Sequence, residues 1–226
     1  RRNVKEANPE AIVLAEHYGD PTSWLQGDQW DTVMNYDAFM EPITWFLTGM
    51  EKHSDSYNSG LYGNGQSFFD AMAYHMSRMQ TNTVFTAMNQ LSNHDHSRFL
   101  TRTNQVVGRI GNMGPERASE NVKKCVMREA VMIQMTWPGA PTLYYGDEAG
   151  VCGWTDPDSR RTYPWGREDL ELMEFHRYMA GIHKRLPALR KGAVKPLFAA
   201  NQQISYGRMW GKYQTVTIIS NLPQPT

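Results

Sequence analysis

Short apolar runs alternate along this chain with longer segments in which apolar residues recur at helical spacing. Such alternation is typical of a parallel α/β architecture, in which a helix follows each strand and returns the chain to the next one. The apolar runs predict four strands, at residues 11–16, 31–36, 84–95 and 140–148. The helical spacing predicts four main helices, at residues 36–50, 67–79, 121–137 and 168–189.

Three of the predicted strands end in polar side chains. The run "AIVLAE" stops at Glu16, which predicts a strand buried on both faces with a carboxylate at its carboxyl end. The other two polar tips are Asn93-His94-Asp95 and Asp147-Glu148. Because the carboxyl ends of parallel strands lie at one edge of the sheet, where catalytic groups gather, we expect the three tips to converge on one site.

The pattern of the chain changes near Ala193. The segment "VKPLFAANQQISYGRMWGKYQTVTIISN" predicts antiparallel strands joined by turns that contain glycine. We therefore place a domain boundary at Gly192, with residues 1–192 in one unit and residues 193–226 at the beginning of a second. The second segment is too short for an independent β-domain, so we expect it to be the start of a larger one.

Composition excludes several classes of function. Lys and Arg together number 23, as do Asp and Glu, so no basic excess indicates a nucleic-acid partner. No apolar run is long enough to cross a bilayer, and no charge run indicates a membrane surface. Cys125 and Cys152 form no metal-binding spacing, and two free thiols leave the cellular compartment open. The aromatic content of 12% suits a protein core as well as stacking on sugars.

The polar tips carry the pair of carboxylates that glycoside hydrolysis needs. One carboxyl group must protonate the leaving oxygen and another must meet the positive charge of the transition state. Glu16, at the end of an apolar strand, suits the proton donor, and Asp95 follows two hydrogen-bond donors, Asn93 and His94, that favour the ionised form. The alternative is that Asn93-His94-Asp95 is a turn with capping residues. The residues alone leave both interpretations open.

Four motifs resemble the α-amylase family, glycoside hydrolase family 13, in the order that the family shows them. "LSNHDHSRF" resembles the Asn-His-Asp motif after the seventh barrel strand, and "GAPTLYYGDE" resembles the signature of the eighth. "VLAEHYGD" followed by "WLQGDQWDTVMNY" is similar to the general-acid motif after the fifth strand and the run into the sixth. "DPDSRRTYPW" (156–165) is similar to a loop of the neopullulanase and cyclomaltodextrinase branch.

This resemblance implies a fold and an activity. The fold would be the C-terminal half of a (β/α)8 TIM barrel, strands five to eight, followed by the start of a C-terminal antiparallel β-domain. The activity would be that of a retaining glycosidase that hydrolyses α-1,4-glucosidic bonds in glucans of the starch and maltodextrin type. It requires no cofactor, and the calcium site common in the family draws on the other half of the barrel, so we expect no metal here.

The resemblance also assigns roles to single residues. Glu16 would be the general acid/base, and Asp95 would stabilise the transition state, with His94 bound to the same sugar. Asp156 and Arg160 would contact substrate on the non-reducing side of the cleaved bond. His17 and Trp24 would line the acceptor side. Supporting roles would fall to Tyr36, Arg98, Asp147 and Glu148.

One part of the family's machinery has no counterpart in this sequence. The family's nucleophile is an Asp in a Gly-x-Arg-x-Asp motif after the fourth strand, and neither this motif nor the third-strand Asp-x-x-x-Asn-His motif is found. We therefore expect the partner of this chain to be the missing N-terminal half of the barrel. Alone, the chain should be inactive and prone to self-association. A transglycosylase of the same family and a non-catalytic glucan-binding half-barrel remain as alternatives.

Overall fold

The structure is a computed structural model that describes residues 1–222. Its four parallel strands are β1 (Leu14–Ala15), β2 (Thr32–Val33), β3 (Met88–Gln90) and β4 (Ala140–Thr142). Its α-helices are α1 (Arg2–Ala7), α2 (Glu41–Thr48), α3 (Gly65–Ser77), α4 (Thr81–Thr86), α5 (Phe99–Arg102), α6 (Ile110–Met113), α7 (Lys124–Thr136), α8 (Leu170–Arg185) and α9 (Pro187–Lys191). A π-helix, η2 (Tyr36–Met40), precedes α2, and short 3-10 turns are η1 (Thr22–Trp24), η3 (Glu116–Ser119) and η4 (Asp158–Arg160).

The parallel strands follow one another in space as they do in sequence. β1 pairs with β2, with Leu14 opposite Thr32, and β3 pairs with β4, with Met88 opposite Ala140. A single parallel bridge between Met34 and Met88 joins the two pairs. The order β1-β2-β3-β4, with helices between β2 and β3 and between β3 and β4 and only the turn η1 between β1 and β2, is that of consecutive units of a (β/α) barrel.

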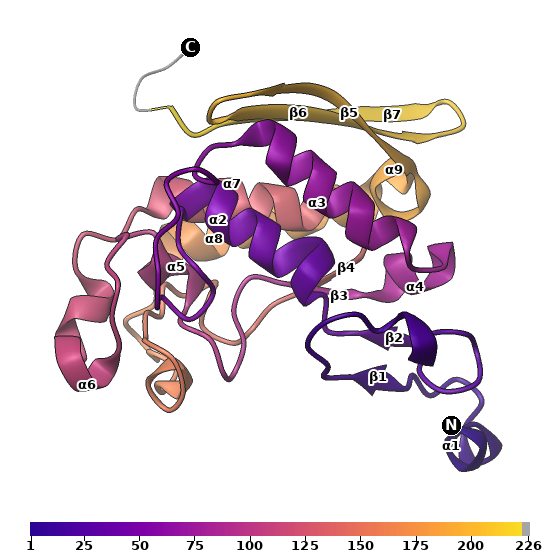
Figure 1. Cartoon of the computed structure of the whole chain (residues 1–226), viewed down its shortest axis with the longest axis horizontal. Helices are drawn as coiled ribbons and strands as arrows, with labels where there is room; N and C mark the ends of the chain where they lie inside the picture. The colour runs from indigo at the N-terminus through magenta and orange to yellow at the C-terminus, as the bar shows by residue number, and fades with distance from the viewer. Residues whose placement is uncertain (223–226) are drawn as a thin grey trace.

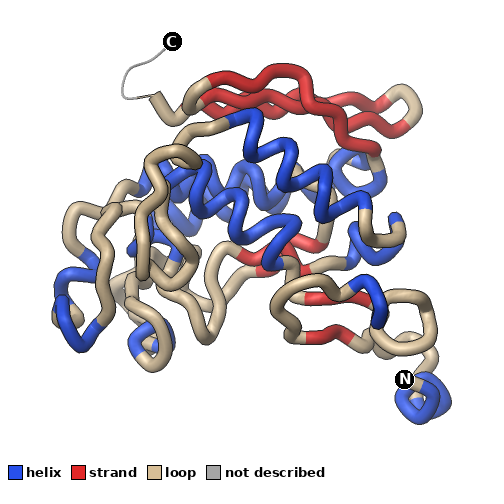
Figure 2. Tube along the Cα trace, viewed as in Figure 1, coloured by secondary structure: helices blue, strands red, loops and turns tan. Residues whose placement is uncertain are grey.

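Three layers make up the molecule (Figures 1 and 2). Helices α2, α3, α7 and α8 lie between the parallel strands on one side and an antiparallel sheet on the other. The pair β1-β2 lies beside this body, next to α1 and the N-terminus. No helix in residues 1–222 combines the length and the apolar character that crossing a bilayer requires.

The predicted strands exist, but all four are shorter than the apolar runs. The prediction of a strand over 84–95 is wrong at its start. Val84 to Thr86 complete α4, and Val84 N donates to the Gln80 carbonyl. The run 140–148 ends its pairing at Thr142 and then turns. The prediction that the first strand is buried on both faces is also wrong: Leu14 is 38% exposed, because none of the described residues covers that face.

The predicted helices are confirmed with small shifts at their ends. Asn64 begins α3 by accepting a hydrogen bond from Ser67 N, and Asp169 begins α8 by accepting one from Leu172 N. Pro42 is the second residue of α2, a position near the start of a helix at which proline is tolerated. The helix predicted over 168–189 is broken at Leu186, because Pro187 cannot continue the α8 hydrogen bonds and starts α9 instead.

The antiparallel sheet begins at Ala193, as predicted. It contains β5 (Ala193–Ala200), β6 (Gln203–Trp210) and β7 (Tyr213–Ser220), in that order. The buried Tyr206 packs edge-on against Trp137 at 4.9 Å and shares a hydrogen bond of 2.6 Å with Thr136. The sheet and the helices thus share one core, and the division into two domains at Gly192 stays a prediction. Residues 223–226 of the proposed second unit lie outside the described residues.

Candidate active site

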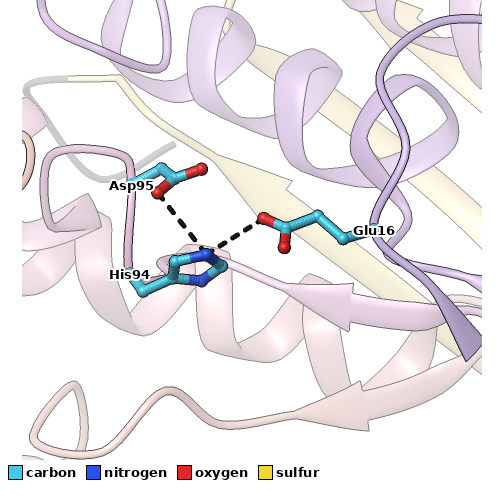
Figure 3. A group of neighbouring side chains, drawn as sticks. All are labelled: Glu16, His94 and Asp95. Carbon is cyan, nitrogen blue, oxygen red and sulfur yellow. Dashed lines mark ion pairs between the residues drawn. The ribbon is translucent and has the colours of Figure 1, made fainter.

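Two of the three polar tips meet at the carboxyl ends of the parallel strands. Glu16 directly follows β1, and His94 and Asp95 lie in the loop that follows β3. Nε2 of His94 is 3.0 Å from Glu16 Oε1 and 3.4 Å from Asp95 Oδ1. Figure 3 shows the imidazole between the two carboxylates. All three side chains are 36–43% exposed, so a ligand could reach each of them.

A tight turn places His94 and Asp95. Oδ1 of Asn93 accepts hydrogen bonds of 3.0 Å from the backbone N–H groups of both Asp95 and His96. Nδ2 of Asn93 donates to the hydroxyl of the buried Tyr36 at 3.0 Å. The turn interpretation and the site interpretation are therefore compatible, because Asn93 forms the turn that presents the next two side chains.

The loop that contains Asp156 and Arg160 borders the same site. Nε of Arg160 is 2.7 Å from Asp156 Oδ1 and donates to the carbonyl of His94 at 3.2 Å. Nη2 of Arg160 is 4.0 Å from Asp95 Oδ1, and the backbone N–H of Asp156 donates to the Asp95 carbonyl at 3.1 Å. The hydroxyl of Ser159 also donates to the His94 carbonyl, at 2.9 Å. The sequence-predicted loop residues are thus in contact with the two residues at the centre of the site.

An aromatic cluster forms around His17, the residue that follows Glu16. His17 meets Trp24 edge-on at 4.7 Å and is 5.4 Å from Trp30. The two indoles are stacked at 5.0 Å. His17 and Trp24, predicted from the sequence, therefore lie together, and the structure adds Trp30, which the sequence reasoning missed.

The third polar tip does not join the site. Asp147 is buried, and its Oδ1 accepts from Nη1 of Arg98 at 3.0 Å. The same Arg98, with 0% of its side chain exposed, also donates to the carbonyls of Tyr145 and Ser159 and stacks on Tyr144. Convergence of all three tips was the wrong expectation for Asp147, because the buried guanidinium of Arg98 pairs with its carboxylate.

Two further residues at the site were missed by the sequence reasoning. The hydroxyl of Tyr18 donates to Asp95 Oδ2 at 3.1 Å and lies 3.3 Å from Nε2 of His96, which is fully buried. Burial lowers the pKa of His96 to about 2, so its imidazole is neutral at physiological pH. The signal for Tyr18 was only its place two residues after Glu16, because both residues lie beyond the end of β1 and strand alternation does not apply to them. Nothing in the pattern distinguished His96 from its neighbours.

Two groups of described side chains have the spacing that a cation would accept. These are Glu16, His94 and Asp95, and a second group of Glu51, His53 and Asp55. In both groups the closeness is accounted for by the contacts among the side chains: His94 with Glu16, His53 with Glu51 at 2.7 Å, and Arg109 with Asp55. The prediction that this chain binds no metal stays a prediction.

With this geometry established, comparison with known proteins identifies the family. A family model for the alpha-amylase catalytic domain matches residues 1–193. The chain belongs to the α-amylase catalytic-domain family. Within it, the chain is 34% identical over 218 residues to an amylopullulanase of Thermoanaerobacterium saccharolyticum, covering 92% of this chain and 16% of the relative. It is 33% identical over 208 residues to neopullulanase 2 of Thermoactinomyces vulgaris, covering 91% and 31%.

Solved α-amylase-family enzymes with (β/α)8 barrels share this fold. The debranching enzyme of Nostoc punctiforme superimposes with a TM-score of 0.82 at 29% identity, covering 98% of this chain and 43% of that protein. A cyclomaltodextrinase superimposes with a TM-score of 0.79 at 28% identity, covering 97% and 33%. The chain therefore spans less than half the length of these relatives.

Proposed function

We propose that this chain supplies the acid/base part of the active site of a retaining glycosidase that hydrolyses α-1,4-glucosidic bonds in starch-type glucans. The observation that carries the proposal is the position of Glu16 and Asp95, two accessible carboxylates within 3.4 Å of one His94 nitrogen at the carboxyl ends of parallel strands. Two carboxyl groups across a sugar are the equipment of glycoside hydrolysis. The names of the relatives, amylopullulanase and neopullulanase among them, support an α-glucan as substrate.

The proposed reaction is a double displacement. In the first step, a nucleophilic carboxylate from the remainder of the barrel attacks the anomeric carbon while Glu16 gives its proton to the leaving glycosidic oxygen. In the second, the Glu16 carboxylate takes a proton from water, whose oxygen attacks the same carbon and releases the nucleophile. Asp95 and His94 would hold the ring hydroxyls of that sugar, because the positive charge and the distorted ring of the transition state strengthen those bonds.

In this proposal, β1 to β4 are strands five to eight of the barrel, and strands one to four with the nucleophile belong to the part outside this chain. Asp156 and Arg160 would contact a glucose on the non-reducing side, since their loop abuts His94 and Asp95. His17 and Trp24 would line the acceptor side, next to Glu16.

Replacement of the acid/base tests this assignment. In the protein that carries this chain together with the rest of the barrel, Glu16→Gln should lower kcat on maltooligosaccharides by about a hundredfold or more, because Gln cannot protonate the leaving oxygen. Formation of the intermediate from aryl glycosides with good leaving groups should fall much less, since they need little protonation. Glu10→Gln, in the exposed segment before β1, is the matched control and should leave both unchanged.

Equal losses on activated and unactivated substrates would contradict the role of Glu16. If the Glu16→Gln variant kept its activity on both substrates, the non-catalytic alternative would be favoured for these residues.

The aromatic cluster favours transglycosylation as a second candidate. Trp24 and Trp30 stack on each other beside His17, the residue that follows Glu16, and a sugar stacked on these rings would compete with water as the acceptor. Products longer than the substrate, seen by chromatography of maltotriose digests and reduced by Trp24→Ala, would identify this activity.

A further inference from the structure

We infer that Tyr18 is a positioning residue for Asp95, and that the buried His96 fixes the Tyr18 hydroxyl in the orientation this requires. The inference rests on the proposed function, because Asp95 is given its role there. It adds two residues to the site, neither of which the sequence motifs assign.

The three side chains form a line of hydrogen bonds that leads from the core to the site. His96 is 0% exposed, and its Nε2 lies 3.3 Å from the Tyr18 oxygen. The Tyr18 hydroxyl in turn donates to Asp95 Oδ2 at 3.1 Å. Asp95 is 36% exposed at the end of this line, where a sugar could reach it.

The number of protons that each group carries determines which group donates in each hydrogen bond. A tyrosine hydroxyl carries one proton, and here it is donated to Asp95. Nε2 of His96 must then be the donor to the Tyr18 oxygen, which places the single proton of the neutral imidazole on Nε2. Consistent with this, Nδ1 of His96 has no hydrogen-bond partner within residues 1–222. The Tyr18 hydroxyl also keeps its proton, because burial, with a contribution from Asp95, raises its pKa.

The ring of Tyr18 is held in place on its face and at its edge. It stacks on Tyr36 with the centroids 4.6 Å apart and the planes 17° from parallel. The imidazole of His96 meets it edge-on at 5.9 Å and itself packs against His53 at 4.6 Å. Tyr18 is 47% exposed, so these contacts restrict its ring on one side only, and they direct its hydroxyl at the carboxylate of Asp95.

The consequence is that each oxygen of Asp95 has its own anchor. Oδ1 faces His94 and Arg160, at 3.4 and 4.0 Å, and Oδ2 accepts from Tyr18. Without the Tyr18 hydroxyl, Oδ2 would lose its partner, and the carboxylate would be held only through the longer contacts of Oδ1. Because Asp95 is proposed to hold ring hydroxyls most strongly in the transition state, this loss should reduce kcat more than it changes KM.

Steady-state kinetics on maltooligosaccharides, with the protein that contains the complete barrel, test this inference. Tyr18→Phe keeps the ring and removes the hydroxyl, and we expect kcat to fall about tenfold while KM changes less than about threefold. His96→Leu should produce a similar fall, whereas His96→Gln, whose side-chain N–H can replace Nε2–H, should restore most of the activity. The exposed Tyr178→Phe on α8 is the matched control and should have no effect.

The double variant gives the sharpest result. If His96 acts only through the Tyr18 hydroxyl, then Tyr18→Phe combined with His96→Leu should be no slower than Tyr18→Phe alone. Additive losses, or a Tyr18→Phe variant with unchanged kcat, would overturn the inference. A change in KM alone would also overturn it, because it would mean that Tyr18 binds the sugar directly. If His96→Leu does not fold, as judged by its thermal unfolding, Tyr18→Phe and His96→Gln still decide the matter.

Asp95→Asn separates this inference from the proposed function. If Asp95→Asn is inactive while Tyr18→Phe keeps its kcat, the positioning role of Tyr18 is refuted. The proposed function remains intact in that case. A fully active Asp95→Asn would refute the proposed function itself.

Discussion

Arg160 contacts three separate parts of the candidate site. Its Nε lies against the Asp156 carboxylate and the His94 carbonyl, and its Nη2 approaches Asp95. It is nonetheless 48% exposed, so its remaining N–H groups face solvent, where a glucan hydroxyl could accept them. A side chain that is both anchored and accessible is suited to binding substrate beside the reacting sugar.

Removal of the Arg160 or Asp156 side chain should weaken the binding of long substrates more than that of short ones. Hydrogen bonds between charged groups and hydroxyls contribute roughly 1.5–3 kcal/mol, so Arg160→Ala should reduce kcat/KM for long maltooligosaccharides about tenfold in the complete enzyme. The loss for maltotriose should be smaller. The exposed Arg167→Ala in the same loop serves as the control. Identical losses for both chain lengths would show that the loop is structural.

Glu129 on α7 should make stability depend on pH. Its Oε2 is buried without a partner in the described part of the chain, and burial raises the pKa of this carboxyl from 4.5 to about 8. The unfolded state therefore loses its proton above about pH 4.5 while the folded state keeps it up to about pH 8. The contribution of the protonated Glu129 to the free energy of unfolding is fully present below pH 4.5. It is lost as the pH rises toward 8.

Glu129→Gln should remove this dependence. Near pH 8 the variant should be more stable than the wild type by roughly 2 kcal/mol, a value reduced from the full shift to allow for partial exposure. At pH 4 the two should be equal. Urea unfolding of this chain at both pH values measures the difference, with Glu6→Gln on the exposed α1 as control. A constant difference across the pH range would contradict the assignment.

Among the elements, β6 is attached to the helices through a buried arginine. Arg208 donates to the Thr136 carbonyl at the end of α7 and to the Gly192 carbonyl after α9. Burial lowers the pKa of its guanidinium to about 10, which still leaves it charged at neutral pH. A cation that binds the carbonyls at the end of a helix is favoured by the helix dipole as well.

Arg208→Met should lower the free energy of unfolding by about 3 kcal/mol. The methionine fills much of the volume but leaves the two buried carbonyls without donors. Thermal and urea unfolding of the chain would show the loss, and Lys212→Met in the β6–β7 turn should show none. An unchanged midpoint would mean that the sheet is held by its apolar contacts alone, such as those of Tyr206 with Trp137.

The existence of the elements could be predicted from the sequence, whereas their ends and partners could not. Periodicity indicated the helices because each buries one face, as α7 does. It failed at Val84 to Thr86, where β-branched and aromatic residues have strand propensity but the chain completes a helix. The motifs found Glu16, His94 and Asp95, but the pairing of Asp147 with Arg98 and of Tyr18 with His96 depends on contacts between segments distant in sequence.

At the scale of the whole molecule, the parallel strands present two unpaired edges. Within residues 1–222, β1 pairs only with β2 and β4 pairs only with β3. Leu14 on β1 is 38% exposed and Leu143 after β4 is 43% exposed. In a closed barrel these edges would pair with further strands, and open edges of this kind favour association.

The chain expressed alone should therefore self-associate and hydrolyse no starch. Light scattering should give a mass above that of one chain. A reducing-sugar assay should remain at background, because the proposed reaction needs a nucleophilic carboxylate from the remainder of the barrel. Leu14→Lys or Leu143→Lys should shift the mass toward one chain, whereas Leu170→Lys on the exposed start of α8 should not. A monomeric wild type would contradict the role of the edges, and robust activity would contradict the motif assignment.

The single bridge between Met34 and Met88 has a mechanical consequence for the two carboxylates. Glu16 follows β1 in the β1-β2 pair, and Asp95 lies in the loop after β3 in the β3-β4 pair. The bridge is the place where the two pairs meet. A rotation of one pair against the other about this bridge would change the distance between the two carboxylates without breaking the pairing within either pair. Two hydrogen bonds of Asn35 join the pairs beside this bridge, to Asn89 Oδ1 at 2.8 Å and to the Met88 carbonyl at 3.0 Å, and they would resist such a rotation and so keep the distance between the two carboxylates.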